Sequence, residues 1–578
     1  MHTRASARSW FLLCTLGLGA LCCTQLENGA DSFGGLNGGG SNAIAGSDSE
    51  APDAGKSNGG TAGASGGSDT AGGGGTSSKA GSSSAGDQPG MGGVGEGGAS
   101  CVDEDGFKGL GCFRCEPHDI VRLENACTDS TCEPFSGTRL PLVKAGKLPD
   151  LPVPASGGSG GSAGSAGGGG GGGSAGAGGS AGVGFACDSL TSDGTVIYVT
   201  GSTAVKPFLQ QIAQQMSLQK VFVVYASTGS CVGVDAIVNG TLMRTGAKPL
   251  PASATYWESS SSTGKQCDLP AAGVTADLGI SDVFAPSCPG FELANLEALK
   301  IRDAHGPIQT MTFAVPGNSK YREISQQAAY LVFGFGKDGQ VLDLAAGQPI
   351  WNSETSILQR SATSGTQVML AAAIGVPPGQ WKGKPNGSSD DVAGALQAAT
   401  ATQATADATI GILGADYIDS RNLRAQIRVL AYQDTHQVCA VTPDSTDTAK
   451  DKRNVRDGHY PIWGPLHLLY KVSASGEPQN VAIRSQLMDM VGYLSGSKAL
   501  PNGVSLIDVY AQSGLVPECA MRVTRSADGG AVTPSRPAAP CACLFEKKAT
   551  GVTNCTACKV QGDCRVGETC SQGYCEQP

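Results

Sequence analysis

The chain has 578 residues, of which 86 are glycine, 5% are aromatic and 16% are charged. This composition excludes a single compact globule, because such a domain contains far less glycine. The formal net charge of −10, without a long basic run, excludes a nucleic-acid scaffold, so no nucleic acid is expected as a partner.

Residues 1–22 predict an export signal. Two arginines precede an apolar run from Trp10 to Leu21, which has the length of a signal-peptide core and is too short to span a membrane. Cys22 and Cys23 follow directly and resemble the acceptor of a bacterial lipoprotein signal, where a thiol receives a diacylglyceryl group. We expect a lipoprotein of the cell envelope, in the periplasm or at the cell surface, that touches the membrane only through this anchor. Cleavage with plain secretion is the alternative.

Half of the glycine lies in two segments. Residues 23–100 hold 25 glycines and residues 152–184 hold 17, with almost no branched apolar residues. Such segments bury too little surface to offset the entropy of ordering the chain, and they lack the strict triplet of collagen. We predict two disordered linkers here, and a third, Pro/Ala/Gly-rich linker over residues 526–540.

Cysteines mark two small modules on either side of a large domain. The chain has 21 cysteines, which, behind an export signal, indicate an oxidising compartment. Five lie in a module over residues 101–135, six in a domain over residues 185–525, and seven in a module over residues 541–578. The six can pair among themselves. If all other pairs are local, the odd numbers imply one bridge between the modules or one free thiol in each.

No metal, cofactor or catalytic centre is predicted. The pairs Cys112/Cys115 and Cys555/Cys558 have the spacing of zinc ligands, which leaves structural zinc as an alternative, but exported chains more often oxidise such pairs. The six histidines are scattered along the chain. No HExxH and no phosphate-loop lysine motif is present, and GxSxG occurs only in the glycine-rich segments, not at a strand–helix turn. We expect a binding protein rather than an enzyme.

Three predicted strands of the large domain lead into helices through turns of glycine, serine and threonine. The strands are "TVIYVT", "VFVVYAS" and "SILQR", and the helices are "AVKPFLQQIAQQM", "VGVDAIVNG" and "QVMLAAAIG". Each turn directs hydroxyls and unpaired backbone N–H groups to one place, where the helix dipole adds positive charge. Arg360 lies four residues before Ser364 in the last turn and can fork two oxygens of a tetrahedral anion. The three junctions together predict an anion site.

A carboxylate restricts which anion can bind. The short strand "ADLGISDV" ends near Ser281 and Asp282. A carboxylate repels an anion unless the ligand has a proton to donate, as hydrogen phosphate does and sulfate does not. The alternative is that Asp282 only caps the next turn.

These segments resemble the phosphate-binding proteins of bacterial ABC transporters, members of the type 2 periplasmic binding protein superfamily, over most of residues 186–500. "GSTAVKP", "GSCVGVDAI", "ADLGISD" and "RSATSGT" resemble the four phosphate turns of that family, in order. The resemblance implies an α/β fold with two lobes that close over the ligand. The phosphate shell that it implies comprises Thr203, the backbone amide of Ala204, Ser230, Asp282, Arg360, Ser364, Gly365 and Thr366.

The resemblance implies inorganic phosphate or a similar oxyanion as the ligand and an ABC transporter permease as a partner. Residues 242–275 are an insertion, which we expect disulfide bonds of Cys231, Cys267 and Cys288 to hold near the mouth of the cleft. There the insertion could cap the site or admit a larger phosphorylated ligand. The main alternative function is a cell-surface interaction or adhesion protein that reuses the binding fold. A weaker alternative is a phosphatase.

Overall fold

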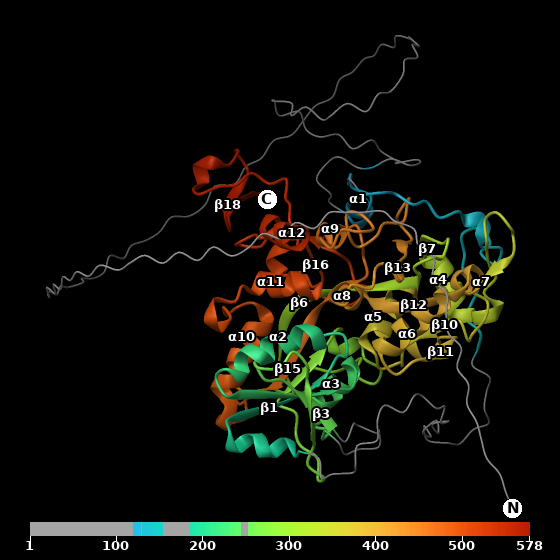
Figure 1. The fold of residues 1–578 in the computed structure, drawn as a ribbon. Coiled ribbons are helices and arrows are strands. Elements are labelled where there is room, and N and C mark those ends of the chain that lie inside the picture. Colours follow the sequence, from blue (N-terminus) through green and yellow to red (C-terminus); the bar gives the residue numbers. More distant parts are fainter. Residues whose placement is uncertain (1–111, 113–118, 129, 154–184, 244–252, 578) are drawn as a thin grey trace, which may run out of the picture. The chain divides into compact units, whose positions relative to one another are not determined.

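The structure is a computed structural model, shown in Figure 1. The predicted export signal, Cys22, Cys23 and nearly all of the two long glycine-rich segments lie outside the residues that it describes. Within the described part of the chain, every helix is too short or too polar to cross a lipid bilayer. The described residues are 112, 119–128, 130–153, 185–243 and 253–577.

Two α/β lobes share one long strand, β6 (Ile301–Pro316) (Figure 1). Its first ten residues pair antiparallel with β15 (Trp463–Lys471) in one lobe. Its last six residues pair antiparallel with β12 (Ile410–Gly414) and β13 (Ile427–Val429) in the other lobe. The chain therefore passes from the first lobe to the second along β6 and returns through β15. This topology confirms the α/β class and the two lobes predicted from the sequence.

The sheet of the first lobe has the strand order β6-β15-β5-β1-β2-β3-β4. Strand β1 is parallel to β2 and β5, and helices cover both of its faces. Ile197 and Val199 pack with α2, α10 and α11, whereas Val196 packs with α3 on the other face. Burial on both faces explains the continuous apolar run in β1. The bounds are β1 (Thr195–Gly201), β2 (Val221–Ser227), β5 (Leu278–Ser281), α2 (Lys206–Ser217), α3 (Ser230–Val238), α10 (Arg484–Ser495) and α11 (Leu506–Ser513).

The insertion extends the edge of this sheet. Strands β3 (Ser253–Tyr256) and β4 (Lys265–Asp268) form an antiparallel hairpin, and β3 pairs with β2. A disulfide joins Cys267 in β4 to Cys187, at the start of the domain. Part of the insertion, residues 244–252, lies outside the described residues. A second disulfide, Cys231–Cys288, joins the first turn of α3 to the segment after β5.

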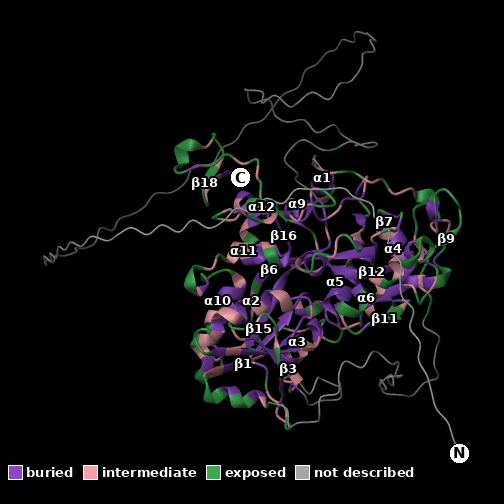
Figure 2. Ribbon diagram, viewed as in Figure 1, coloured by how far each residue is buried: buried purple, intermediate pink, exposed green. Residues whose placement is uncertain are grey.

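The second lobe has the strand order β11-β10-β12-β6, with β13 also on β6. Helices α4 and α5 pack on one face of this sheet and α6 and α8 on the other, and both layers contain buried residues (Figure 2). A small parallel pair, β7 and β14, lies beside it. The bounds are β7 (Glu323–Ser325), α4 (Gln326–Phe335), β8 (Val341–Leu342), β9 (Pro349–Ile350), β10 (Ile357–Gln359), α5 (Gly365–Ile374), β11 (Lys384–Pro385), α6 (Ser389–Ala398), α7 (Gln403–Ala408), α8 (Ala415–Ser420), β14 (Ala431–Gln433) and α9 (Arg453–Arg456).

Each cysteine module is bonded to the large domain rather than to the other module. Cys132 of the first module pairs with Cys439, and Cys541 of the second pairs with Cys519. The expectation that the six cysteines of the domain pair among themselves is therefore wrong. The odd cysteine of each module instead forms a disulfide with one of the six. Among the described cysteines, the other pairs within the modules are Cys112–Cys127, Cys543–Cys555, Cys558–Cys570 and Cys564–Cys575. Because Cys112, Cys555 and Cys558 are in disulfides, the alternative of structural zinc at these pairs is excluded.

The described part of the first module and the segment after it pack on the second lobe. Helix α1 (Ile120–Glu124) places Leu123 in the main hydrophobic core. The Asn125 amide donates to the His436 carbonyl at 2.7 Å and accepts from the Val438 N–H at 2.9 Å. These contacts and the Cys132 bridge fix the module to the lobe.

The C-terminal segments pack on the large domain in a similar way. Residues 526–540, expected as a linker, include β17 (Thr533–Pro534), which pairs with β16 (Val523–Thr524). Asp528 in this segment accepts a hydrogen bond from the Phe284 N–H at 2.9 Å. Phe545 of α12 is buried in the main core. The remaining elements are α12 (Ala542–Thr550), β18 (Thr569–Ser571) and β19 (Tyr574–Glu576).

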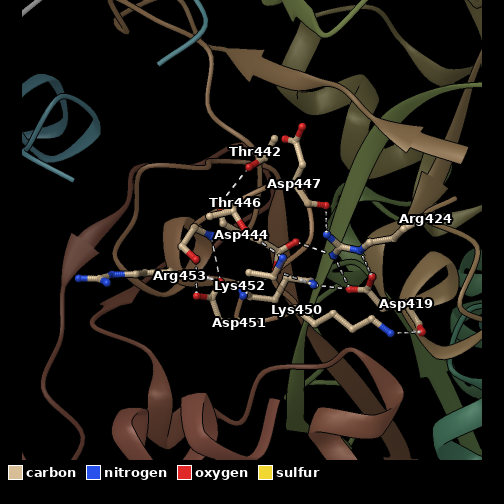
Figure 3. Close-up of polar contacts among 12 residues, drawn as sticks. Asp419, Arg424, Thr442, Asp444, Thr446, Asp447, Lys450, Asp451, Lys452 and Arg453 are labelled. Carbon is tan, nitrogen blue, oxygen red and sulfur yellow. Dashed lines mark hydrogen bonds and ion pairs between the residues drawn. The ribbon is translucent and has the colours of Figure 1, made fainter. Parts of the chain in front are cut away.

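A buried ion-pair network holds the loop before α9 against α8 (Figure 3). Lys452 is fully buried, and its ammonium contacts the carboxylates of Asp419 and Asp444. Arg424 pairs with the same two carboxylates, at 2.5 Å to Asp419 and 2.6 Å to Asp444. The two cations therefore neutralise the two carboxylates, and no unpaired charge of this network is left to bind a ligand.

We expect Lys452→Met to destabilise the protein by about 3–5 kcal/mol, because it leaves two buried carboxylates with one cation. The matched control is Lys498→Met, because Lys498 is half-exposed and pairs with Asp489 at the surface. That change should cost less than about 1 kcal/mol. Urea unfolding of the oxidised protein measures both values. Equal losses in the two variants would contradict the structural role of the network.

Candidate anion-binding site

Three loops of the first lobe meet at one edge of its sheet. Because β1, β2 and β5 are parallel, their carboxyl ends lie at the same edge. Gly201 ends β1 with a φ of 137°, and a Cβ there would lie 1.9 Å from the Ile280 carbonyl oxygen. Only glycine therefore allows β1 to run this close to the end of β5. The approach brings the loops that carry Thr203, Ser230 and Asp282 together.

Asp282 and Ser230 form a buried pair. The Ser230 hydroxyl donates to Asp282 Oδ2 at 2.9 Å, and the Asp282 N–H donates to Ser230 Oγ at 3.2 Å. Asp282 is 2% exposed, and its Oδ1 is buried without a hydrogen-bond partner. Burial raises the pKa of Asp282, although the nearby hydroxyls of Ser202 and Ser230 and the charge of Arg360 act in the opposite direction. One oxygen of a basic carboxylate thus remains available to a proton donor.

Arg360 reaches this place from the second lobe. It follows β10, is 2% exposed, and donates from Nη1 to the Ser389 hydroxyl at 2.7 Å. Its Nη2 donates to Thr203 Oγ1 and to the Gly387 carbonyl, both at 3.3 Å. Burial lowers the pKa of Arg360, while the charge of Asp282 opposes the shift.

The guanidinium of Arg360 is incompletely satisfied. Its Nε is buried without a hydrogen-bond partner, and among the described residues no carboxylate forms an ion pair with it. A buried cation that no carboxylate contacts is costly, so an anion here would stabilise the protein.

The start of α5 closes the site. A Cβ on Gly365 would lie 2.3 Å from Ser230 Oγ and 2.7 Å from Asp282 Oδ2. The Cys231 N–H donates to the Thr363 carbonyl at 3.2 Å, so the turn before α5 rests on the start of α3. Ser364 is the N-cap of α5 and makes no side-chain capping bond, and both Ser364 and Thr366 are buried. The first N–H groups of α5 have no partner within the helix and are donors for an anion.

The structure brings together five of the eight predicted residues through the contacts above: Thr203, Ser230, Asp282, Arg360 and Gly365. Ser364 and Thr366 flank Gly365 in the chain. The Ala204 amide, expected to face the ligand, donates to Ser202 Oγ at 3.2 Å. Cys22 and Cys23 lie outside the described residues, so their lipidation stays a prediction.

Three residues near the site were missed in the sequence analysis. The Ser389 hydroxyl and the Gly387 carbonyl accept hydrogen bonds from Arg360. The "SSDD" sequence forms a capping box between Ser388 and Asp391 at the start of α6, and this pattern could have indicated a fourth helix start at the site. Asp416, in the first turn of α8, is buried with an unpartnered Oδ1. Burial raises the pKa of Asp416 well above its usual range, and the charge of Asp282 adds to the shift. No sequence pattern indicates this proximity.

Comparisons with known proteins give structural neighbours only. No family model and no curated protein matches the chain. An ABC-type phosphate transport receptor from Vibrio cholerae has 12% identity and a TM-score of 0.34, covering 55% of this chain and 99% of its own. A phosphate-binding protein from Stenotrophomonas maltophilia has 13% identity and a TM-score of 0.33, covering 56% and 90%. The reduced OxyR regulatory domain from Pseudomonas aeruginosa has 10% identity and a TM-score of 0.27, covering 52% and 95%. At these identities and TM-scores the neighbours carry no conclusion about function.

We expect Gly365→Ala to cost about 1–3 kcal/mol of stability, because the added methyl overlaps Ser230 and Asp282. Gly394→Ala is the matched control: it lies within α6, and a Cβ there meets nothing within 4 Å. Alanine is the better helix former, so that variant should gain about 0.5–1 kcal/mol. Thermal and urea unfolding measure both. A neutral Gly365→Ala would show that the two lobes do not meet closely at this point.

Proposed function

We propose that the protein is a solute-binding protein of the cell envelope that holds phosphate, or the phosphate group of a larger ligand, between its lobes without turnover. The observation that carries the proposal is the pair of incompletely satisfied buried groups, Arg360 and Asp282. The guanidinium requires negative charge, and the carboxylate requires a proton donor. Hydrogen phosphate supplies both in one tetrahedral group, whereas sulfate supplies only the charge.

The proposed ligand shell draws on both lobes. Thr203, Ser230 and Asp282 would contact the anion from the first lobe, and the Ala204 amide would join them by exchanging Ser202 Oγ for the anion. Arg360 and the N-terminal residues of α5, Ser364, Gly365 and Thr366, would contact it from the second. A desolvated acceptor such as Asp282 discriminates strongly against an anion that has no proton to donate, so burial would make the site selective.

The disulfides support an oxidising location. Eight are described, and two of them join the modules to the large domain. We propose export with a lipid anchor at Cys22 or Cys23, and delivery of the captured anion to an ABC transporter permease. Two alternative functions predict other results. If the protein is a cell-surface interaction protein that reuses the fold, it should bind no anion. If it is a phosphatase, it should release phosphate from a phosphoester.

Arg360→Ala should weaken phosphate binding by about a hundredfold or more, because charge-assisted hydrogen bonds contribute about 1.5–3 kcal/mol each. Arg360→Lys keeps the charge but loses the fork, so it should recover only part of the affinity. Arg484→Ala, at a partly exposed surface pair, is the control. Calorimetry on the oxidised full chain measures the affinities. Undiminished binding in Arg360→Ala, or none in the unaltered protein, would refute the proposal.

Asp282→Asn should reduce the preference for phosphate over sulfate, because the amide can donate to either anion and no longer demands a proton. The control is Asp277→Asn, since Asp277 is a half-buried carboxylate beside the opposite end of β5. Competition between the two anions at neutral pH provides the measurement. A preference equal to that of the unaltered protein would remove Asp282 from the selectivity mechanism.

A further inference from the structure

We propose that Asp303, His305 and His467 bind a divalent transition-metal ion of the zinc class. The two histidines are 162 positions apart in the chain, but β6 and β15 pair so that His467 lies directly opposite His305. Asp303 is two residues before His305 in β6, and residues two apart in a strand share a face of the sheet. One ligand atom from each of the three lies within 4.8 Å of the others.

Two atoms of this cluster are buried and unsatisfied. His467 is fully buried, and its Nδ1 lies 2.8 Å from Asp303 Oδ2. Its Nε2 and Asp303 Oδ1 are both buried without a hydrogen-bond partner. The Phe284 ring packs against the His467 ring with the centroids 4.2 Å apart and the planes tilted by 59°, which restricts the imidazole. Buried polar atoms without partners are costly, so a metal ion that took either of these atoms as a ligand would offset part of that cost.

The geometry requires little adjustment. Zinc bonds of about 2.0–2.2 Å in a tetrahedron place neighbouring ligand atoms about 3.4 Å apart. The observed separations are at most 4.8 Å, and His305 is exposed, so a rotation of its side chain can bring it closer. The hydrogen bond of 2.8 Å between His467 Nδ1 and Asp303 Oδ2 would open when an ion takes its place. His305 also lines a cavity of about 380 Å³ together with Glu518. A fourth ligand, either water or the Glu518 carboxylate, can therefore enter from this cavity.

The donor set selects the metal. Two imidazoles and a carboxylate suit zinc and neighbouring first-row ions better than calcium or magnesium, which prefer oxygen alone. Thiolate does not compete for the ion in the large domain, because all six cysteines there are in disulfides. A bound ion would cross-link β6, the strand that both lobes share, to β15.

The test uses the oxidised full chain, stripped of metal with a chelator and titrated with Zn²⁺ by calorimetry. We expect one site, and a loss of affinity of at least about a hundredfold in His305→Ala. His436→Ala is the matched control, because His436 is also exposed but lies outside the cluster. Co²⁺ should give the visible d–d bands of tetrahedral nitrogen and oxygen ligation, and these should vanish in His305→Ala but persist in His436→Ala.

Because His305 is exposed, its replacement should leave the melting temperature of the metal-free protein unchanged, so a loss of binding reports the ligand itself. Asp303→Asn provides a second variant and should also weaken the site. Failure of the unaltered protein to take up Zn²⁺, or equal affinity in His305→Ala and His436→Ala, would overturn the proposal. Neither result depends on phosphate binding.

Discussion

The shared strand β6 is the constraint on which the rest of the structure depends. Backbone hydrogen bonds hold its first part in one lobe and its last part in the other, so the two sheets are joined through a continuous strand. The main hydrophobic cluster extends across the same elements, from α3 to α4 and α5. This arrangement brings Arg360, from one lobe, to Thr203, from the other. Neither lobe alone carries both the guanidinium and the carboxylate of the proposed anion site.

Burial has opposite consequences in two polar clusters of the protein. In the network of Asp419, Arg424, Asp444 and Lys452, each charge faces an opposite charge, and the result is a fixed loop. In the candidate site, Arg360 has no carboxylate partner and one Asp282 oxygen has no donor among the described atoms. Both clusters lose hydration of their charged groups on burial. In the first cluster the paired charges offset this cost, whereas in the candidate site a bound ligand would have to offset it.

The cysteine modules are extensions of the large domain. Short segments rarely bury enough surface to fold alone, and disulfides commonly compensate. Here the described residues of the first module place Leu123 in the core of the domain, and the C-terminal module does the same with Phe545. The bridges through Cys132 and Cys541 then make these contacts permanent.

Local sequence patterns determined most of the strands and turns that carry the candidate site. Apolar runs identified the strands, and glycine, serine and threonine after them placed the turns of Thr203, Ser230 and Gly365, because helix starts and strand ends depend on neighbouring residues. Only the tertiary structure decided which distant groups meet. It paired Cys132 with Cys439 rather than with another module, set Ser389 against Arg360, and placed His467 opposite His305. The physical reason is that sheet register and lobe contacts arise from packing over the whole domain, which leaves no trace in the local spacing of residues.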